Sequence, residues 1–142
     1  SYACDAKHME IFRALVEARG DVDTPDSFGR TALNDASGDG FTEGVRYLVE
    51  RGADVNKINA DIMRYTPLTS ASSSAKVEVV RVLLEAGADV NKRKGDGRSP
   101  LYYALKRQPW DTEQRRQAKA QVAALLREAG AQEPQPHDLE NL

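Results

Sequence analysis

The chemistry open to this chain of 142 residues is limited by its small number of reactive side chains. It contains two histidines, His8 and His137, and one cysteine, Cys4. A zinc site needs several such ligands close together, and a nucleophilic triad needs a histidine beside a nucleophile and an acid; the sequence has neither spacing. The Gly38-Asp39-Gly40 segment is not followed by the Gly-Lys-Ser/Thr of a phosphate-binding loop. We therefore assign no catalytic residues, no metal ligands and no cofactor, and predict that the protein is not an enzyme.

The charge and hydropathy of the chain exclude further classes of function. It carries 20 basic and 22 acidic side chains, so its formal net charge of -2 leaves no general affinity for nucleic acid. Its apolar runs are far shorter than the ~20 residues of a membrane helix. A single cysteine excludes an internal disulfide, which fits a reducing compartment. We predict no nucleic acid, no membrane insertion and no small-molecule substrate. The predicted location is cytoplasmic, or periplasmic or exported if a signal peptide was removed before Ser1.

Two phrases recur along the chain with nearly the same period. Residues 48–57 and 83–92 both end in GADVNK, at an offset of 35 residues. Thr31-Ala32-Leu33, Thr66-Pro67-Leu68 and Ser99-Pro100-Leu101 follow one another at spacings of 35 and 33. One such unit cannot bury its apolar face alone, so the shared period predicts units that stack into a solenoid.

Each repeated phrase has a role at a helix end. A Thr or Ser hydroxyl caps the free N–H groups of a starting helix, and proline fits the first helical position because its missing N–H costs nothing there. Apolar residues at helical spacing then predict a second helix, which ends near Gly52 or Gly87. Each unit is therefore predicted as helix, short break, helix and extended turn.

These phrases resemble the ankyrin repeat family. Its TPLHxA phrase is matched by Thr31–Ala36, Thr66–Ala71 and Ser99–Ala104, and its LLxxGADVN phrase by the two segments above. The resemblance implies an all-α ankyrin-repeat solenoid of helix-turn-helix units with extended β-hairpin-like turns. It also implies a non-catalytic module that binds another protein through the turn tips and the concave face of the first helices. The implied ankyrin repeat domain covers residues 1–131, with a partial repeat at 1–23 and full repeats at 24–57, 58–92 and 93–131.

The sequence departs from the family pattern at several positions. Asn34, Thr69 and Tyr102 replace a histidine that in the family ties neighbouring turns together, so we expect lower stability than in a consensus repeat. Arg64 stands where the other turns have glycine, so we expect a different shape there. Gly44 stands where an apolar residue is usual, which predicts local underpacking.

The partial first repeat is predicted to consist mainly of a second helix over Lys7–Glu17. Tyr2–Cys4 would be the tail of its first helix. We therefore expect the natural chain to extend upstream of Ser1.

The last repeat carries an insertion at residues 107–119. Pro109 is predicted to end the first helix, and Asp111 to cap a second helix that runs to about Ala129. Residues 132–142 are rich in proline and polar side chains and predict a disordered tail.

The predicted partner-binding residues lie on the turn tips, on the first helices and in the insertion. Ile62, Met63 and Tyr65 form the best candidate for a binding hot spot, because an exposed tip has little structural reason to hold them. The alternative is that they fold onto neighbouring tips. Trp110 is a second candidate, and its alternative is a plug over the end of the core. The full set is Phe28, Arg30, Asp35, Asp39, Ile62, Met63, Arg64, Tyr65, Ser73, Arg98, Tyr103, Arg107 and Trp110.

The charges on this face run from acidic near the N-terminus to basic near the C-terminus, which suggests a partner with an acidic patch. The favoured hypothesis is a chain that is a monomer when free and binds one protein partner, as an inhibitor or immunity-type protein. The alternative is a scaffold or self-association fragment of a longer ankyrin protein. A catalytic site that the sequence does not reveal is the third hypothesis.

Overall fold

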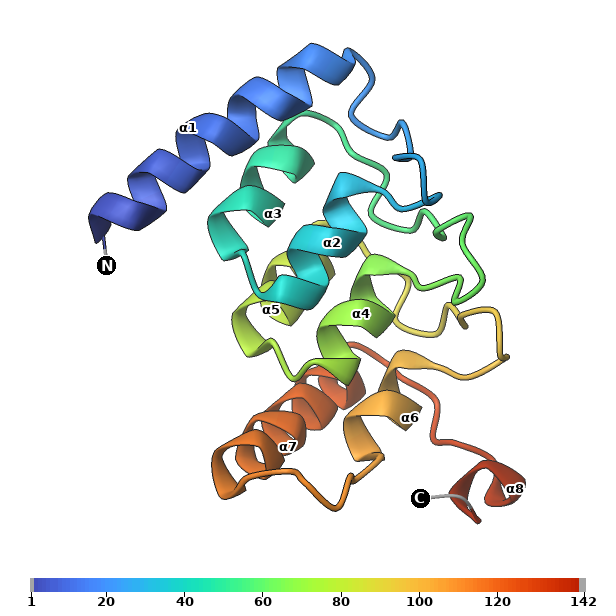
Figure 1. Cartoon of the computed structure of the whole chain (residues 1–142). Coiled ribbons are helices and arrows are strands. Elements are labelled where there is room, and N and C mark those ends of the chain that lie inside the picture. Colours follow the sequence, from blue (N-terminus) through green and yellow to red (C-terminus); the bar gives the residue numbers. More distant parts are fainter. Residues whose placement is uncertain (1, 141–142) are drawn as a thin grey trace.

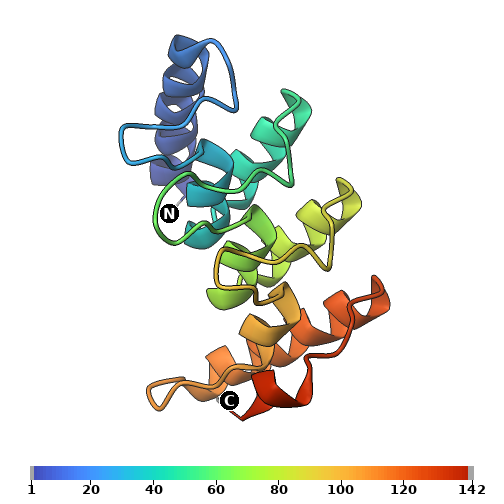
Figure 2. The ribbon, with the colours of Figure 1, turned by 90° about the vertical axis from the view of Figure 1, so that its right-hand side faces the viewer.

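The regular elements of the chain form two stacked rows of helices. The computed structural model describes residues 2–140, with side chains from Lys7 onward, and every regular element in this range is a helix. Figure 1 shows α2, α4 and α6 in one row and α3, α5 and α7 in a second row behind it, and Figure 2 shows the stack from the side of the long turns. This arrangement confirms the predicted all-α solenoid. The helices are α1 (Tyr2–Arg19), α2 (Ala32–Asp39), α3 (Thr42–Glu50), α4 (Pro67–Ser73), α5 (Val77–Glu85), α6 (Pro100–Leu105), α7 (Glu113–Glu128) and α8 (Pro136–Leu139).

The first helices begin where the repeated phrases predict. The side chains of Thr31, Thr66 and Ser99 each accept a hydrogen bond from the N–H three residues later, at 3.2, 3.1 and 3.3 Å. Pro67 and Pro100 open their helices without leaving a donor unpaired. The caps fix the register of each first helix and so direct its leucine inward.

The core is a thin layer between the two rows. Every full repeat contributes aliphatic side chains to this core, and their burial is the main stabilising term of the stack. The core includes Leu33, Val45, Leu48, Leu68, Val80, Leu83, Leu101, Val122 and Leu126, all at most 2% exposed.

The N-terminal helix differs from the prediction. α1 runs without a break from Tyr2 to Arg19, so the predicted division between Tyr2–Cys4 and Lys7–Glu17 is wrong. The linking Asp5-Ala6 pair contains neither glycine nor proline, and nothing in it ends a helix.

The start of α7 is also displaced from its predicted position. α7 begins after Thr112, whose Oγ1 accepts a hydrogen bond from the Arg115 N–H at 3.1 Å. Asp111 was predicted as the cap, but its carboxylate turns inward and pairs with Lys119 and Arg115 instead. The helix therefore starts one residue later than a cap at Asp111 would place it.

The predicted disordered tail contains a helical turn. Residues 136–139 form α8, and the N–H of Gln135 donates to Asp138 Oδ2 at 3.1 Å. The preceding residues are tied to the stack by an Arg127–Glu133 ion pair at 2.7 Å. Residues 141–142 of that tail, and Ser1, lie outside the described range.

Gly44 is not underpacked. The Phe41 ring lies against it and leaves no room for a Cβ, so an aromatic side chain three residues earlier supplies the missing apolar contact.

The long turns form three tips, closed by a backbone hydrogen bond between their end residues. These are the first tip (26–30, 2.8 Å), the second tip (59–65, 2.9 Å) and the third tip (94–98, 3.0 Å). The second tip is longer than the others by two residues. Arg64 nevertheless adopts the left-handed conformation, at φ 50°, that Gly29 and Gly97 adopt in the other tips. The second tip therefore differs in length but keeps the same closing geometry.

Replacing Ala75 with glycine is expected to raise the free energy of unfolding by about 1 kcal/mol, because Ala75 is held at φ 58°, where a Cβ is strained. Gly40 occupies the same place between α2 and α3, at φ 75°. Urea denaturation measures the change. Ala124→Gly, on the exposed side of α7, is the matched control and should lower stability by about 1 kcal/mol. A loss of stability in both variants would contradict the strain at Ala75.

Candidate partner-binding groove

Three hollows run together along the tips and the first helices. The tip hollow, of about 560 Å³, lies between the first and second tips, and the central hollow, of about 220 Å³, lies along α2 and α4. The insertion hollow, also about 220 Å³, lies between α4, α6 and the insertion. The first two share Arg30, Asp61 and Met63, and the last two share Tyr65 and Ser73. Together they form one continuous groove.

The tip hollow carries a cluster of exposed apolar side chains. Phe28 is 70% exposed, Ile62 97% and Met63 50%. The two tips touch at their bases, where the N–H of Ala60 donates to the carbonyl of Gly29 at 2.7 Å, and a side chain on Gly29 would collide with Ala60. The apolar side chains therefore stand on a backbone that is already fixed.

Asp26 shapes the first tip. Its Oδ1 accepts hydrogen bonds from the N–H groups of Arg30 and Phe28, each at 2.9 Å. The bond from Arg30 is the main reason that the pKa of Asp26 lies below its ordinary value. The Arg30 guanidinium lies over the Phe28 ring, 5.1 Å from its centre, so a cation covers one face of this aromatic ring.

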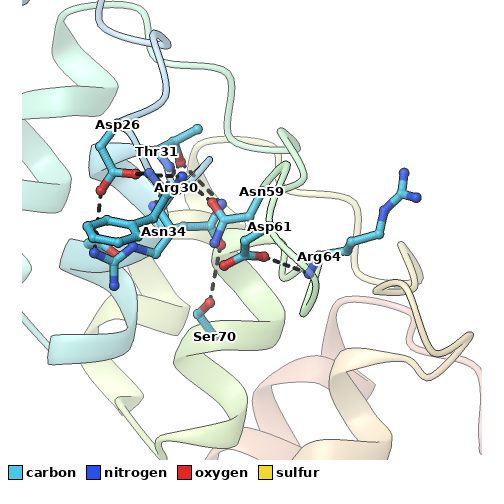
Figure 3. Close-up of polar contacts among 10 residues, drawn as sticks. Asp26, Arg30, Thr31, Asn34, Asn59, Asp61, Arg64 and Ser70 are labelled. Atoms are coloured by element: carbon cyan, nitrogen blue, oxygen red, sulfur yellow. Dashed lines mark hydrogen bonds and ion pairs between the residues drawn. The ribbon is translucent and has the colours of Figure 1, made fainter.

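The wall of the central hollow is a buried polar network. Asn34 donates from Nδ2 to the Lys57 carbonyl at 3.0 Å and accepts from Ser70 Oγ at 3.1 Å, which ties α2 to the next turn and to α4. Asn59 Oδ1 accepts from the Thr31 N–H at 3.0 Å (Figure 3). Asn34 thus ties neighbouring turns together although it replaces the family's histidine, whereas Thr69 bonds only within its own helix start.

The central hollow is acidic. Asp35, Asp39 and Asp61 line it, together with the single cation Arg30. Partial burial raises the pKa of Asp35, and the charges of Asp26 and Asp39 raise it further against the opposing effect of Arg30.

A buried lysine joins the second and third tips. Lys94 is 8% exposed, donates from Nζ to the Met63 carbonyl at 3.3 Å and lies 3.4 Å from Asp96 Oδ2. Its ammonium also sits 4.6 Å from the centre of the Tyr65 ring. Lys94 therefore holds the backbone of the exposed Met63 in place.

Tyr103 was predicted as an exposed aromatic, and this is wrong, since only 8% of it is exposed. Its hydroxyl donates to Asp96, and its ring packs against Tyr102 and Tyr65. Burial, followed by the bond to Asp96, raises the pKa of Tyr103. Burial acts against ionisation of Asp96, but the bonds from Tyr103 and from the Arg98 N–H outweigh it and lower the pKa of Asp96.

The insertion hollow is built around one buried carboxylate. Asp111 lies 2.8 Å from Lys119 Nζ and 3.0 Å from Arg115 Nε, and its Oδ2 also accepts the Gln108 N–H at 2.8 Å. The Lys119 bond is the largest cause of the lowered pKa of Asp111, followed by that of Gln108. Arg115 reaches on to the Ser73 carbonyl at 3.1 Å, which fastens the insertion to α4.

Trp110 projects from this fastened loop. It is 74% exposed, so the alternative that it plugs the end of the core is wrong. The neighbouring Asp111 turns inward, which leaves the adjacent indole facing out.

The structure brings most of the predicted site residues to one groove. Arg64, Arg98 and Arg107 do not line it: Arg64 packs on Gly95, Arg98 lies over the Tyr102 ring, and Arg107 lines a separate hollow between α6 and α7. The ten that do are Phe28, Arg30, Asp35, Asp39, Ile62, Met63, Tyr65, Ser73, Tyr103 and Trp110.

Sequence reasoning missed the charged framework of the groove. Asp61 was not among the predicted site residues, and Asp111 was predicted only as a helix cap, with no role given to Arg115 or Lys119 in the insertion. The spacing of four between Asp111, Arg115 and Lys119 was a usable signal, because residues four apart lie on one side of a helix.

No group of three or more His, Cys, Asp or Glu side chains that could hold a metal ion occurs in the described part of the chain. Among the helices described, none combines the length and apolar character needed to cross a membrane.

Comparison with known proteins agrees with the repeat architecture. Residues 1–59 match a family model of ankyrin repeats (3 copies), and residues 68–112 match a second model of ankyrin repeats (many copies). A segment of 53 residues is 49% identical to the E3 ubiquitin-protein ligase Ufd4 of Drosophila melanogaster, covering 37% of this chain and 2% of that protein. A segment of 69 residues is 38% identical to the potassium channel AKT1 of Arabidopsis thaliana, covering 46% of this chain and 8% of that protein.

The chain thus spans only a small part of the length of these relatives. Ankyrin repeat proteins are typically non-catalytic interaction modules. The chain belongs to the ankyrin repeat family and is a protein–protein interaction module.

Proposed function

We propose that the groove binds one protein partner, with Met63 and Tyr65 at its centre and Trp110 at one end. The observation that carries the proposal is the cluster of Phe28, Ile62 and Met63 around one open hollow. Single exposed apolar residues are ordinary, but a cluster of them on a rigid surface is typical of binding sites.

The rigidity of the tips supports the same proposal. Ile62 is almost fully exposed and contributes nothing to the core, while Lys94 and the Ala60–Gly29 bond hold the backbone on either side. A partner would not have to order these tips on binding, which favours affinity.

We further propose that the module is a monomer when free and acts by covering its partner, as an inhibitor or immunity-type protein does. A chain without catalytic residues of its own affects a partner through what it occludes or recruits. Occlusion is favoured here because the groove reaches from the first tip to the insertion.

Met63→Ala and Tyr65→Ala are each expected to weaken partner binding by more than about 1 kcal/mol while leaving the helical CD signal intact. Affinity capture from the lysate of the source organism, with the double variant alongside, identifies the partner, and titration calorimetry then gives the affinities. Tyr65→Phe keeps the ring that faces Lys94. Comparison with Tyr65→Ala therefore separates loss of the packing of the ring within the protein from loss of the contact with the partner. Arg81→Ala, on the exposed side of α5, is the surface control. Unchanged affinity in both alanine variants would remove the hot spot.

A second candidate function, self-association or scaffolding, is favoured by the exposed face of α1. Ile11 is 50% exposed and Leu15 61% exposed at one end of the stack. Another copy or a further repeat could cover this face. Sedimentation at high concentration tests it: dimers that Leu15→Glu abolishes would support self-association, and a monomer throughout would support the first candidate.

A further inference from the structure

The groove has opposite charge at its two ends. At the α2 end, Asp39 forms no ion pair among the described residues, and Asp61 accepts only the Arg64 N–H at 2.9 Å. Arg30, the one cation there, is already engaged by Asp26 at 3.4 Å and by Asp35 at 3.9 Å. This end therefore presents uncompensated negative charge.

The other end presents uncompensated positive charge. Lys106, Arg115 and Lys119 line the insertion hollow, and Asp111 is the carboxylate that pairs with two of them. Lys106 forms no ion pair among the described residues, and the Arg115 side chain is 40% exposed. One buried carboxylate cannot balance three cations, and the aromatic walls of the hollow exclude some of the water that would screen them.

The floor between the two ends is lined by small residues and is suited to a main chain. Gly38, Ser70, Ser73 and Ser74 line the central hollow with small side chains. Met63 and Tyr65 form its apolar flank. A peptide backbone can approach such a floor closely while one of its side chains meets the apolar flank.

The distance between the ends sets the spacing of complementary charges in a ligand. α2 packs against α4 and α4 against α6, so the ends are two helix spacings apart, about 16–20 Å at 8–10 Å each. An extended chain advances about 3.3 Å per residue, so about five or six residues cover that span.

Building on the function proposed above, we propose that the groove takes an extended segment of the partner whose charges oppose its own. A basic side chain lies over Asp39, and an acidic side chain lies over Lys106 and Arg115, about five or six residues away. An apolar side chain between them rests on Met63 and Tyr65. Charge complementarity fixes the direction of the segment as well as its register.

Selection from a random linear peptide library displayed on phage tests this pattern. The wild type is expected to enrich peptides with a basic and an acidic residue at the stated spacing. Asp39→Lys should exchange the basic position for an acidic one, and Lys106→Glu should exchange the acidic position for a basic one. Both side chains are at the surface of the groove, and the Lys106 carbonyl that accepts Lys119 is unchanged by the substitution. Arg81→Glu, outside the groove, is the matched control and should enrich the wild-type pattern.

Binding of the selected wild-type peptide should fall at least tenfold in each reversed variant and recover when the matching peptide charge is reversed. Enriched peptides without the charge pair, or a pattern that neither reversal changes, would overturn the charge assignment but leave the groove as a binding site. If the wild type enriches no peptide above the Met63→Ala, Tyr65→Ala variant, the groove itself fails, and the proposed function fails with it.

Discussion

Replacing Lys119 with methionine is expected to lower the midpoint of thermal unfolding by about 10 °C. Lys119 is 5% exposed, and its ammonium bonds both Asp111 Oδ2 at 2.8 Å and the Lys106 carbonyl at 2.7 Å. Methionine fills the same space but takes the nearest cation away from a buried carboxylate, which keeps only the half-exposed Arg115 at 3.0 Å, and a buried charge that loses its main partner is costly.

The same substitution should release the insertion before the stack unfolds. Trp110 is the only tryptophan in the chain, so its fluorescence anisotropy reports the mobility of the loop directly. Lys7→Met, at an exposed position of α1, is the matched control and should change neither reading. The double variant with Asp111→Asn should be less destabilised than the sum of the single variants, because it also removes the buried charge that has lost its main partner. Additive effects would show that the pair does not act as a unit.

The pH dependence of stability gives an independent check of the Asp111 site. Since the pKa of Asp111 is lowered in the folded protein, its contribution is fully present above the unfolded pKa of about 3.9 and is lost as the pH falls through the folded value. The wild type should therefore lose more stability than Lys119→Met between about pH 5 and pH 3. Asp26 and Asp96, whose pKa values are also lowered, titrate in both proteins and cancel in the comparison. If the stability of the two proteins falls equally as the pH is lowered, Lys119 is not the cause of the lowered pKa of Asp111.

Leu68→Ala is expected to lower the free energy of unfolding by about 3 kcal/mol. Leu68 is 1% exposed and lies in α4, the first helix of the middle repeat, so its loss opens a cavity beside both neighbouring repeats. Because each repeat of a solenoid is stabilised mainly by its neighbours, the unfolding transition should also broaden. Urea denaturation followed by CD measures both effects.

Ile62→Ala serves as the control for Leu68, since it removes an aliphatic side chain that is 97% exposed. It should change stability by less than about 0.5 kcal/mol. A similar loss in both variants would mean that the second tip packs in solution, and it would weaken the proposed binding role of Ile62 at the same time.

The fold was predictable because its signals are local. Thr66 and Pro67 specify a helix start through atoms within one turn, and the same phrase repeated at a fixed period specifies stacking. The errors arose where local signals compete. Asp111 and Thr112 are both good caps, and the inward turn of Asp111 depends on Lys119, eight residues on, together with Arg115 and the Gln108 N–H. For α1, a break between two helices was predicted where no residue ends a helix.

The candidate site was less predictable, because side-chain burial depends on residues far along the chain. Tyr103 and Trp110 are both aromatic residues near the end of α6. One is buried by Asp96 and Tyr65, and the other is left outside by the turn of Asp111. Arg107 likewise lies close behind the first helix but lines a separate hollow between α6 and α7. Residue type alone does not separate these cases.

The two additional residues of the second tip have a consequence for how such a protein can diversify. A single backbone hydrogen bond between Asn59 and Tyr65 closes the tip. Ile62 lies at the outer end of the loop that this bond closes and takes no part in the core. Residues can therefore be inserted, deleted or exchanged at the outer end of this tip without shifting the register of the helices on either side. Changes there can alter which partner is bound without affecting folding, so related chains that diverge in partner should differ most around residue 62.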